Sequence, residues 1–80
     1  MALAESVTSY INDNAKREGA PAPQPGDDLF KSGVLDSFTL VDLVAVLEEH
    51  YGIKIPDGDV TAANFQTIQD IENYVEAHKG

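Results

Sequence analysis

Apolar residues recur at helical spacing near the start of the chain, and charged residues occupy the positions between them. This pattern predicts an amphipathic helix from Leu3 to Glu18 that ends at Gly19. The face of this helix expected to be buried consists of Leu3, Val7, Tyr10, Ile11 and Ala15.

The next segment, from residue 20 to Asp36, is predicted to be an unusually long loop. Prolines at positions 21, 23 and 25 remove backbone hydrogen-bond donors and hold the chain extended, which excludes a helix. Loops of this length in compact domains usually have a function or are fixed by apolar anchors. The expected anchors are Leu29, Phe30, Val34 and Leu35.

The clearest helix signal follows this loop. Asp36 stands where an N-cap belongs, Ser37 opens the helix, and a run rich in apolar residues ends at Tyr51 before Gly52. The expected core stripe is Leu40, Leu43, Val44, Leu47 and Tyr51. One stripe cannot bury the remaining apolar residues, so this helix is either nearly surrounded or presents apolar surface to a partner. The residues concerned are Phe38, Val41, Ala45 and Val46.

The rest of the chain predicts shorter elements. Ile53-Lys54-Ile55 alternates like a strand but has no partner strand, so we expect an extended connector with both isoleucines pointing inward. A short helical turn is expected at 61–65, and Thr67 with Asp70 marks the start of a final helix. Its buried face should be Ile68, Ile71, Tyr74 and Val75. The expected fold is all-α: one domain over residues 1–80, a small antiparallel bundle of three main helices and one short helix.

Composition narrows the classes of function. Eighty residues form one small domain and exclude a large enzyme with an enclosed active site. The absence of cysteine excludes disulfides, thiolate metal sites and a cysteine nucleophile. The apolar stretches are shorter than a membrane span and the N-terminus lacks a signal-peptide pattern, so we expect a soluble cytoplasmic protein.

Negative charge is concentrated in the middle of the chain. The net charge is −9, and residues 27–59, with eight acids and two bases, contribute −6 of it. Such a chain repels nucleic acids and anionic membranes, so any charged partner should be basic.

Candidate catalytic and metal-binding patterns are weak, with one exception. His50 and His78 are expected late in helices, where a structural or solvated role is favoured over catalysis. Asp57-Gly58-Asp59 lacks the glycine and glutamate that a calcium-binding loop requires later in its sequence. Ser37 is the exception, because a hydroxyl in the first turn of a helix is exposed and the helix dipole there favours an attached phosphoester. On the dipeptide alone, an ordinary helix cap is the favoured interpretation of Asp36 and Ser37.

A set of residues between Leu29 and Val75 matches the spacing of a known family. The matching residues are Gly33, Leu35-Asp36-Ser37, Leu43, Val44, Leu47, Glu48, Glu49, Tyr51, Gly52-Ile53, Ile55-Pro56-Asp57, Phe65, Thr67, Ile71 and Tyr74-Val75. In these residues the chain resembles the acyl carrier protein family. The resemblance implies that Ser37 accepts 4′-phosphopantetheine from coenzyme A through a phosphodiester, and that the terminal thiol carries an acyl or aminoacyl group as a thioester.

The resemblance also implies the partners of the protein. It would be a monomeric carrier, not an enzyme, modified by a phosphopantetheinyl transferase, charged by a loading ligase or transferase, and serving synthase enzymes with basic docking patches. The second predicted helix would be the main recognition element, because a clustered negative face steers basic partners. The expected partner-binding residues are Asp36, Phe38, Val41, Asp42, Ala45, Glu48, Glu49, Asp57 and Asp59.

The first turn of this helix departs from the commonest pattern of fatty-acid carriers, because Phe38 and Leu40 make it more apolar. We expect Phe38 to enter a partner's pocket and Leu40 to join the core. The pathway therefore stays open between fatty acid, polyketide or other secondary-metabolite synthesis and an aminoacyl, D-alanyl-like carrier loaded by an adenylating ligase. A different class of function is an unmodified helical interaction domain. A hydrolase that uses Ser37 is disfavoured because no base is in sight.

Overall fold

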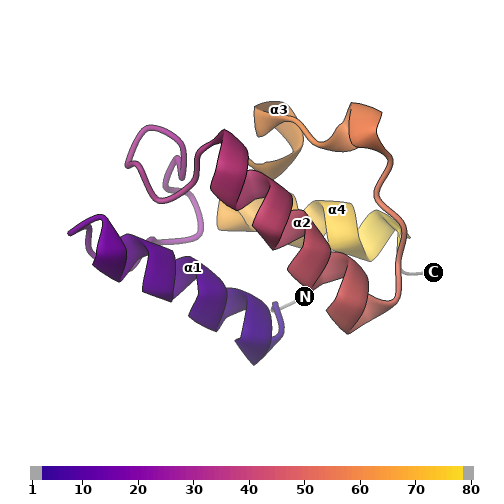
Figure 1. Cartoon of the computed structure of the whole chain (residues 1–80), viewed down its shortest axis with the longest axis horizontal. Helices are drawn as coiled ribbons and strands as arrows, with labels where there is room; N and C mark the ends of the chain where they lie inside the picture. Colours follow the sequence, from indigo (N-terminus) through magenta and orange to yellow (C-terminus); the bar gives the residue numbers. More distant parts are fainter. Residues whose placement is uncertain (1–2, 79–80) are drawn as a thin grey trace.

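The computed structural model describes residues 3–78, and these residues form helices and loops without a strand (Figure 1). The elements are α1 (Glu5–Arg17), α2 (Ser37–Tyr51), a 3-10 turn η1 (Asp57–Asp59), α3 (Ala62–Phe65) and α4 (Ile68–His78). The prediction of an all-α fold with three main helices and one short helix is confirmed. Residues 1–2 and 79–80 of the expected single domain lie outside the described range.

Helix α1 ends at Arg17, just before the glycine at position 19 that the sequence predicts as its stop. This glycine has a φ of 72°, a left-handed conformation that costs little without a side chain. The Gly19 amide donates to Lys16 O at 3.1 Å and the Ala20 amide to Ala15 O at 2.8 Å. These two bonds form a Schellman motif that satisfies carbonyls at the end of the helix.

Helix α2 is capped at both ends by the expected residues. Asp36 Oδ1 accepts hydrogen bonds from Phe38 N and Thr39 N, each 2.9 Å long. Thr39 Oγ1 in turn accepts a 2.7 Å bond from Asp36 N, which completes a capping box. At the other end Gly52 has a φ of 65° and its amide donates to Glu48 O. The start of α2 is therefore held in one conformation by its own side chains.

Helices α1 and α2 lie side by side and run in opposite directions (Figure 1). In the first turn of α1, Ser6 Oγ lies 3.2 Å from Nδ1 of His50, in the last turn of α2. One turn later, the Tyr10 hydroxyl donates a 3.2 Å bond to Thr39 O, in the first turn of α2. The C-terminal end of α1 therefore lies toward the N-terminal end of α2.

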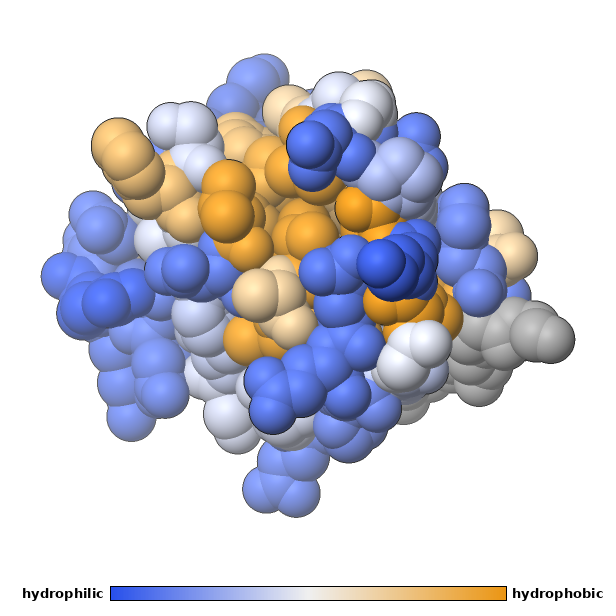
Figure 2. Space-filling view, turned by 45° about the vertical axis from the view of Figure 1, so that its right-hand side comes forward, coloured by the Kyte–Doolittle hydropathy of each residue, from blue (hydrophilic) through white to orange (hydrophobic). Residues whose placement is uncertain are grey.

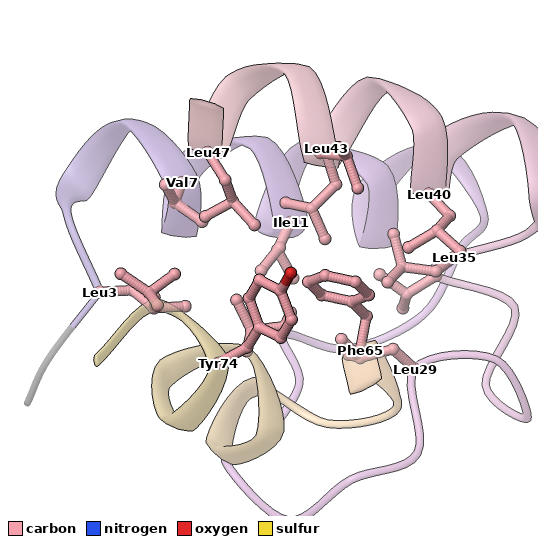
Figure 3. Close-up of a cluster of buried hydrophobic side chains, with 14 of the residues drawn as sticks. Leu3, Val7, Ile11, Leu29, Leu35, Leu40, Leu43, Leu47, Phe65 and Tyr74 are labelled. Carbon is pink, nitrogen blue, oxygen red and sulfur yellow. The ribbon is translucent and has the colours of Figure 1, made fainter. Parts of the chain in front are cut away.

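The hydrophobic core lies between these two helices and α4, as Figure 3 shows. The rings of Phe65 and Tyr74 meet at its centre, with centroids 5.1 Å apart. Tyr10, Tyr51 and Ile68 are only partly buried, whereas the other predicted stripe residues are buried. The buried set is Leu3, Val7, Ile11, Ala15, Leu29, Val34, Leu35, Leu40, Leu43, Val44, Leu47, Ile55, Phe65, Ile71, Tyr74 and Val75.

The long loop before α2 is fixed to a segment near the C-terminus of the chain. Its anchors Leu29, Val34 and Leu35 are buried as predicted, and Phe30 is partly buried. Two backbone hydrogen bonds add to these anchors, from Leu29 N to Gln66 O at 2.8 Å and from Gln69 N to Pro25 O at 3.1 Å. The loop is thus part of the packed structure, joined to the segment between α3 and α4 and to the first turn of α4.

The connector after α2 is extended as predicted, with Ile55 buried and Ile53 partly buried. It then forms the turn η1, which the sequence did not predict. The final helix begins as expected, because Thr67 Oγ1 accepts a 3.0 Å bond from Asp70 N. Within residues 3–78, none of the helices has the length and apolar character needed to cross a membrane.

Candidate functional site

Ser37 is the first residue of α2, and its side chain is exposed. The Asp36 cap engages the amides of Phe38 and Thr39, the next two residues of the helix. Within the part of the chain that the structure describes, neither the hydroxyl nor the amide of Ser37 takes part in a hydrogen bond. A hydroxyl so placed is accessible to a modifying enzyme, and the free amide and helix dipole favour an anion attached there.

Asp36 stands directly before this serine and is negatively charged at neutral pH. The hydrogen bond from Thr39 N, with further bonds from Phe38 N and Thr39 Oγ1, holds the pKa of the Asp36 carboxyl below its usual value. The charge of Arg17 acts in the same direction. Since Asp36 Oδ1 is occupied by the cap, the carboxylate is fixed in place beside Ser37.

Apolar side chains are exposed next to Ser37. Phe38 is 81% exposed and Val41 is 59% exposed, so α2 presents apolar surface instead of being surrounded. The space-filling view shows hydrophobic side chains gathered on one face and bordered by hydrophilic ones (Figure 2). A groove lies between α2 and the connector, and its lining residues are Val41, Val44, Ala45, Glu48, Ile55, Asp57 and Val60. Ser37 lies on the same side of α2 as Val41, Val44 and Glu48, at spacings of three and four residues.

The predicted docking acids fall into two groups. Asp42 and Glu49 on α2 and Asp57 on η1 are exposed and free to meet a partner. Glu48 is partly buried instead, and its Oε2 accepts a 2.8 Å hydrogen bond from Ile55 N.

Asp59 also has a role inside the fold. Its Oδ2 accepts a 2.8 Å hydrogen bond from the Tyr74 hydroxyl, and its carbonyl oxygen accepts one from Asn64 Nδ2 at 2.9 Å. Glu48 and Asp59 therefore hold the connector in place, whatever else they contact.

A protein-family model described as phosphopantetheine attachment site matches residues 6–75, most of the chain. The chain belongs to this family. Its cofactor is therefore a covalently attached 4′-phosphopantetheine, and the protein is a carrier of that group. The resemblance to acyl carrier proteins is confirmed at the level of the family. No solved structure was found to match the chain.

The exposed Ser37 hydroxyl fits the cofactor of this family, because a phosphodiester needs an accessible hydroxyl and no metal or base from the carrier. When attached, the cofactor supplies a thiol, which this cysteine-free chain lacks. Among residues 3–78, no group of three or more acidic or histidine side chains is placed to hold a metal ion.

The two histidines of the carrier lie away from Ser37, at the opposite end of α2 and at the end of α4. His50 Nδ1 contacts Ser6 Oγ at 3.2 Å. His78 stacks on the ring of Tyr74 with centroids 4.0 Å apart, and its Nδ1 lies 2.8 Å from Tyr74 O. The His50 contact joins α1 to α2, whereas the His78 contacts lie within α4, and neither brings a base to Ser37.

Sequence reasoning missed two features of the structure, one beside Ser37 and one in α1. Thr39 completes the capping box, a role that a threonine at the third helical position after a capping aspartate could have signalled. Asn14 is 2% exposed, although the periodicity of α1 suggested apolar residues alone on its buried face. Its Oδ1 accepts a hydrogen bond from Arg17.

Proposed function

We propose that Ser37 is the attachment residue and that the holo protein carries an acyl or aminoacyl group as a thioester between partner enzymes. The observation that supports this assignment is the exposed Ser37 hydroxyl at the start of a firmly capped helix. The capping box fixes the point from which the arm departs, while the arm itself moves freely.

Attachment requires chemistry from a partner and only a nucleophile from this chain. Ser37 Oγ forms a bond to the phosphorus of the phosphopantetheine moiety, and the diphosphate bond of coenzyme A breaks. Adenosine 3′,5′-bisphosphate leaves, and the hydroxyl proton passes to a base of the transferase. The Mg²⁺ ion bound by the transferase stabilises the developing charge, so the carrier needs only to present Ser37 in a recognisable setting.

That setting combines charge with apolar surface. Asp42, Glu49 and Asp57 are exposed acids that attract a basic partner. The exposed ring of Phe38 stands beside Ser37 and offers an apolar anchor for a partner pocket. We propose that transferase and synthase enzymes dock on this face.

The apolar first turn favours a dedicated carrier of secondary metabolism, such as polyketide synthesis, or an aminoacyl carrier, over a general fatty-acid carrier. The two candidates differ in loading. An aminoacyl carrier gains the mass of an amino acid when its holo form is incubated with an adenylating ligase, the amino acid and ATP, whereas a polyketide carrier gains an acyl group from an acyltransferase and acyl coenzyme A.

Mass spectrometry tests the attachment residue. The wild-type chain, incubated with a phosphopantetheinyl transferase, Mg²⁺ and coenzyme A, should gain one phosphopantetheine. Fragmentation of the tryptic peptide of residues 32–54 in the mass spectrometer should place it on Ser37 and not on Ser32. Ser37→Ala should gain none. Ser9→Ala, which removes another exposed hydroxyl, should be modified like wild type. Equal modification of Ser37→Ala would disprove the assignment, and no modification of wild type would favour an unmodified interaction domain.

A further inference from the structure

The connector after α2 is fastened at two points, one on either side of Asp57. Two residues before Asp57, the amide of Ile55 donates a 2.8 Å hydrogen bond to Glu48 Oε2 on α2. Two residues after it, Asp59 Oδ2 accepts a 2.8 Å bond from the hydroxyl of Tyr74 on α4. Asp57 itself is exposed. The position of its carboxylate therefore depends on contacts that its neighbours make.

The turn η1, which carries Asp57, is too short to hold its own shape. Backbone hydrogen bonds within the turn run from Asp59 N to Pro56 O at 2.9 Å and from Val60 N to Asp57 O at 3.1 Å. A single helical turn is unstable in water, because it fixes several backbone torsions for very few hydrogen bonds. Tertiary contacts must therefore hold η1 in place.

Tyr74 ties this turn to the hydrophobic core. It is 8% exposed, and its ring extends from α4 to pack beside Phe65 (Figure 3). Because the ring is closely packed, its hydroxyl has a fixed position, and the hydrogen bond fixes the Asp59 side chain as well. Asn64 Nδ2 adds a 2.9 Å bond to the carbonyl oxygen of Asp59, but this donor comes from the short helix α3. The Tyr74 bond is thus the contact that joins η1 directly to a main helix.

The same bond separates the roles of Asp57 and Asp59. The sequence predicts both as docking acids, yet Asp59 is only partly exposed and one of its carboxylate oxygens is occupied by the Tyr74 hydroxyl. Asp57 is exposed and lines the groove beside α2, on the side of that helix where Ser37 also lies. Of the two acids, Asp57 is the one placed to pair with a basic partner that approaches Ser37.

We propose that Tyr74 and Asp59 are positioning residues for partner docking. Their hydrogen bond holds η1 so that the Asp57 carboxylate meets a basic side chain of the phosphopantetheinyl transferase. This positioning role rests on the proposed docking role of Asp57. A charge that is already held in place binds more tightly, because less free energy is lost in ordering it. Without the Tyr74 bond the turn samples other positions, and the ion pair with the partner weakens.

The test measures the steady-state kinetics of arm loading by a phosphopantetheinyl transferase at low salt, with the apo carrier as the varied substrate. Tyr74→Phe should raise KM about two- to fivefold, the effect of losing one exposed ion pair, without a matching change in kcat. Asp57→Asn should raise KM similarly. The double variant should have a KM no higher than that of the worse single variant, because both changes act on one interaction.

Two further variants separate position from stability and from charge. Thr67→Ala removes the acceptor for Asp70 N at the start of α4 and lowers stability by a comparable amount without touching the connector, so its KM should equal that of wild type. Asp59→Asn removes the charge but keeps an oxygen that can accept from Tyr74, so it should retain most of the docking. Thermal unfolding confirms that every variant is folded at the assay temperature.

Three outcomes would overturn the positioning role and leave Asp57 as a docking residue. They are a wild-type KM for Tyr74→Phe, an equal rise in KM for Thr67→Ala, and effects that multiply in the double variant. A rise in Asp59→Asn as large as that in Tyr74→Phe would also overturn it, because Asp59 would then act through its charge. An unchanged KM for Asp57→Asn would remove the proposed docking role of this acid, and the positioning role would fall with it.

Discussion

The hydroxyl of Tyr74 donates a 2.8 Å hydrogen bond to Oδ2 of Asp59, which joins α4 to the connector that forms one wall of the groove beside α2. Burial, followed by this hydrogen bond and the charge of Asp59, raises the pKa of Tyr74 to about 12. The neutral phenol is thus the form that the fold favours.

Removing this hydroxyl should destabilise the protein. Tyr74→Phe keeps the ring contact with Phe65 but leaves the Asp59 carboxylate without its partner. We expect a loss of about 1 kcal/mol in the free energy of unfolding at neutral pH, measured by urea denaturation. A Tyr74→Phe protein as stable as wild type would show that water replaces the bond without cost.

Tyr74→Phe also tests how the stability contributed by the Tyr74 hydroxyl depends on pH. Because the folded pKa of Tyr74 lies above the ordinary value of 10.0, its contribution is complete below pH 10 and is lost as the pH rises toward 12. The stability gap between wild type and Tyr74→Phe should therefore narrow over this range. A gap that stays constant up to pH 12 would contradict the raised pKa.

The cap of α2 should be sensitive to acid. Asp36→Ala removes the acceptor for Phe38 N and Thr39 N and should lower Tm by roughly 2–8 °C at pH 7. The pKa of Asp36 is lowered in the fold, chiefly by the bond from Thr39 N, so its contribution is present above pH 3.8 and is lost as the pH falls through the folded value. Asp36→Asn, which keeps an acceptor oxygen, should retain most of the stability and lose this pH dependence.

Adding a single methyl group at Gly52, in the left-handed turn after α2, should destabilise the protein. Gly52 has a φ of 65°, so Gly52→Ala forces a side chain into a disfavoured conformation and should cost about 1–2 kcal/mol. Gly58→Ala is the matched control, since Gly58 has no positive φ and a methyl group there meets open space. Denaturation curves should separate the two variants, and equal losses would argue against conformational strain.

Charge reversal at exposed acids should slow attachment of the arm. We expect Asp42→Lys with Glu49→Lys to reduce the rate of loading by a transferase about tenfold at low salt, because steering by the acidic face is lost. High salt should shrink the difference. Asp13→Lys with Glu72→Lys, outside this face, gives the same net charge and should load normally. Circular dichroism checks the fold of both, and equal rates for the two pairs would remove the docking role from Asp42 and Glu49.

Glu48 was also predicted to be a docking acid, but reversing its charge would not test docking alone. Glu48→Lys would remove the acceptor of the 2.8 Å bond from Ile55 N as well as the negative charge. Slower loading could then result from a displaced connector. Glu48→Gln keeps the acceptor and isolates the effect of the charge.

Local signals made the helices of this carrier predictable. Asp36 and Gly52 fix the ends of α2 through contacts with residues a few positions away, so the sequence reveals them directly. The spacing of apolar residues likewise indicated which faces are buried. The start of α2 made Ser37 a candidate, but the resemblance to the acyl carrier protein family was needed to favour an attachment site over an ordinary cap.

Contacts between distant segments were not predictable. The bond from Tyr74 to Asp59 and that from Leu29 N to Gln66 O depend on how helices meet in three dimensions. Asp59 looked like a free surface acid because nothing near it in the sequence indicates a tyrosine hydroxyl. Buried Asn14 was missed for a similar reason, since periodicity identifies a buried face by its apolar members alone.

The long loop is attached to the residue that follows α3 and to the first turn of α4, and this attachment has a consequence for how the protein can be divided. Leu29 and Pro25 pair through their backbones with Gln66 and Gln69, so the first helix and its loop complete the packing of the last. A fragment that ends after α2 would lack these partners and Phe65, the buried ring at the centre of the core. Folding should therefore be all-or-none. A partner enzyme should then encounter only the fully folded carrier, because no partly folded form is populated.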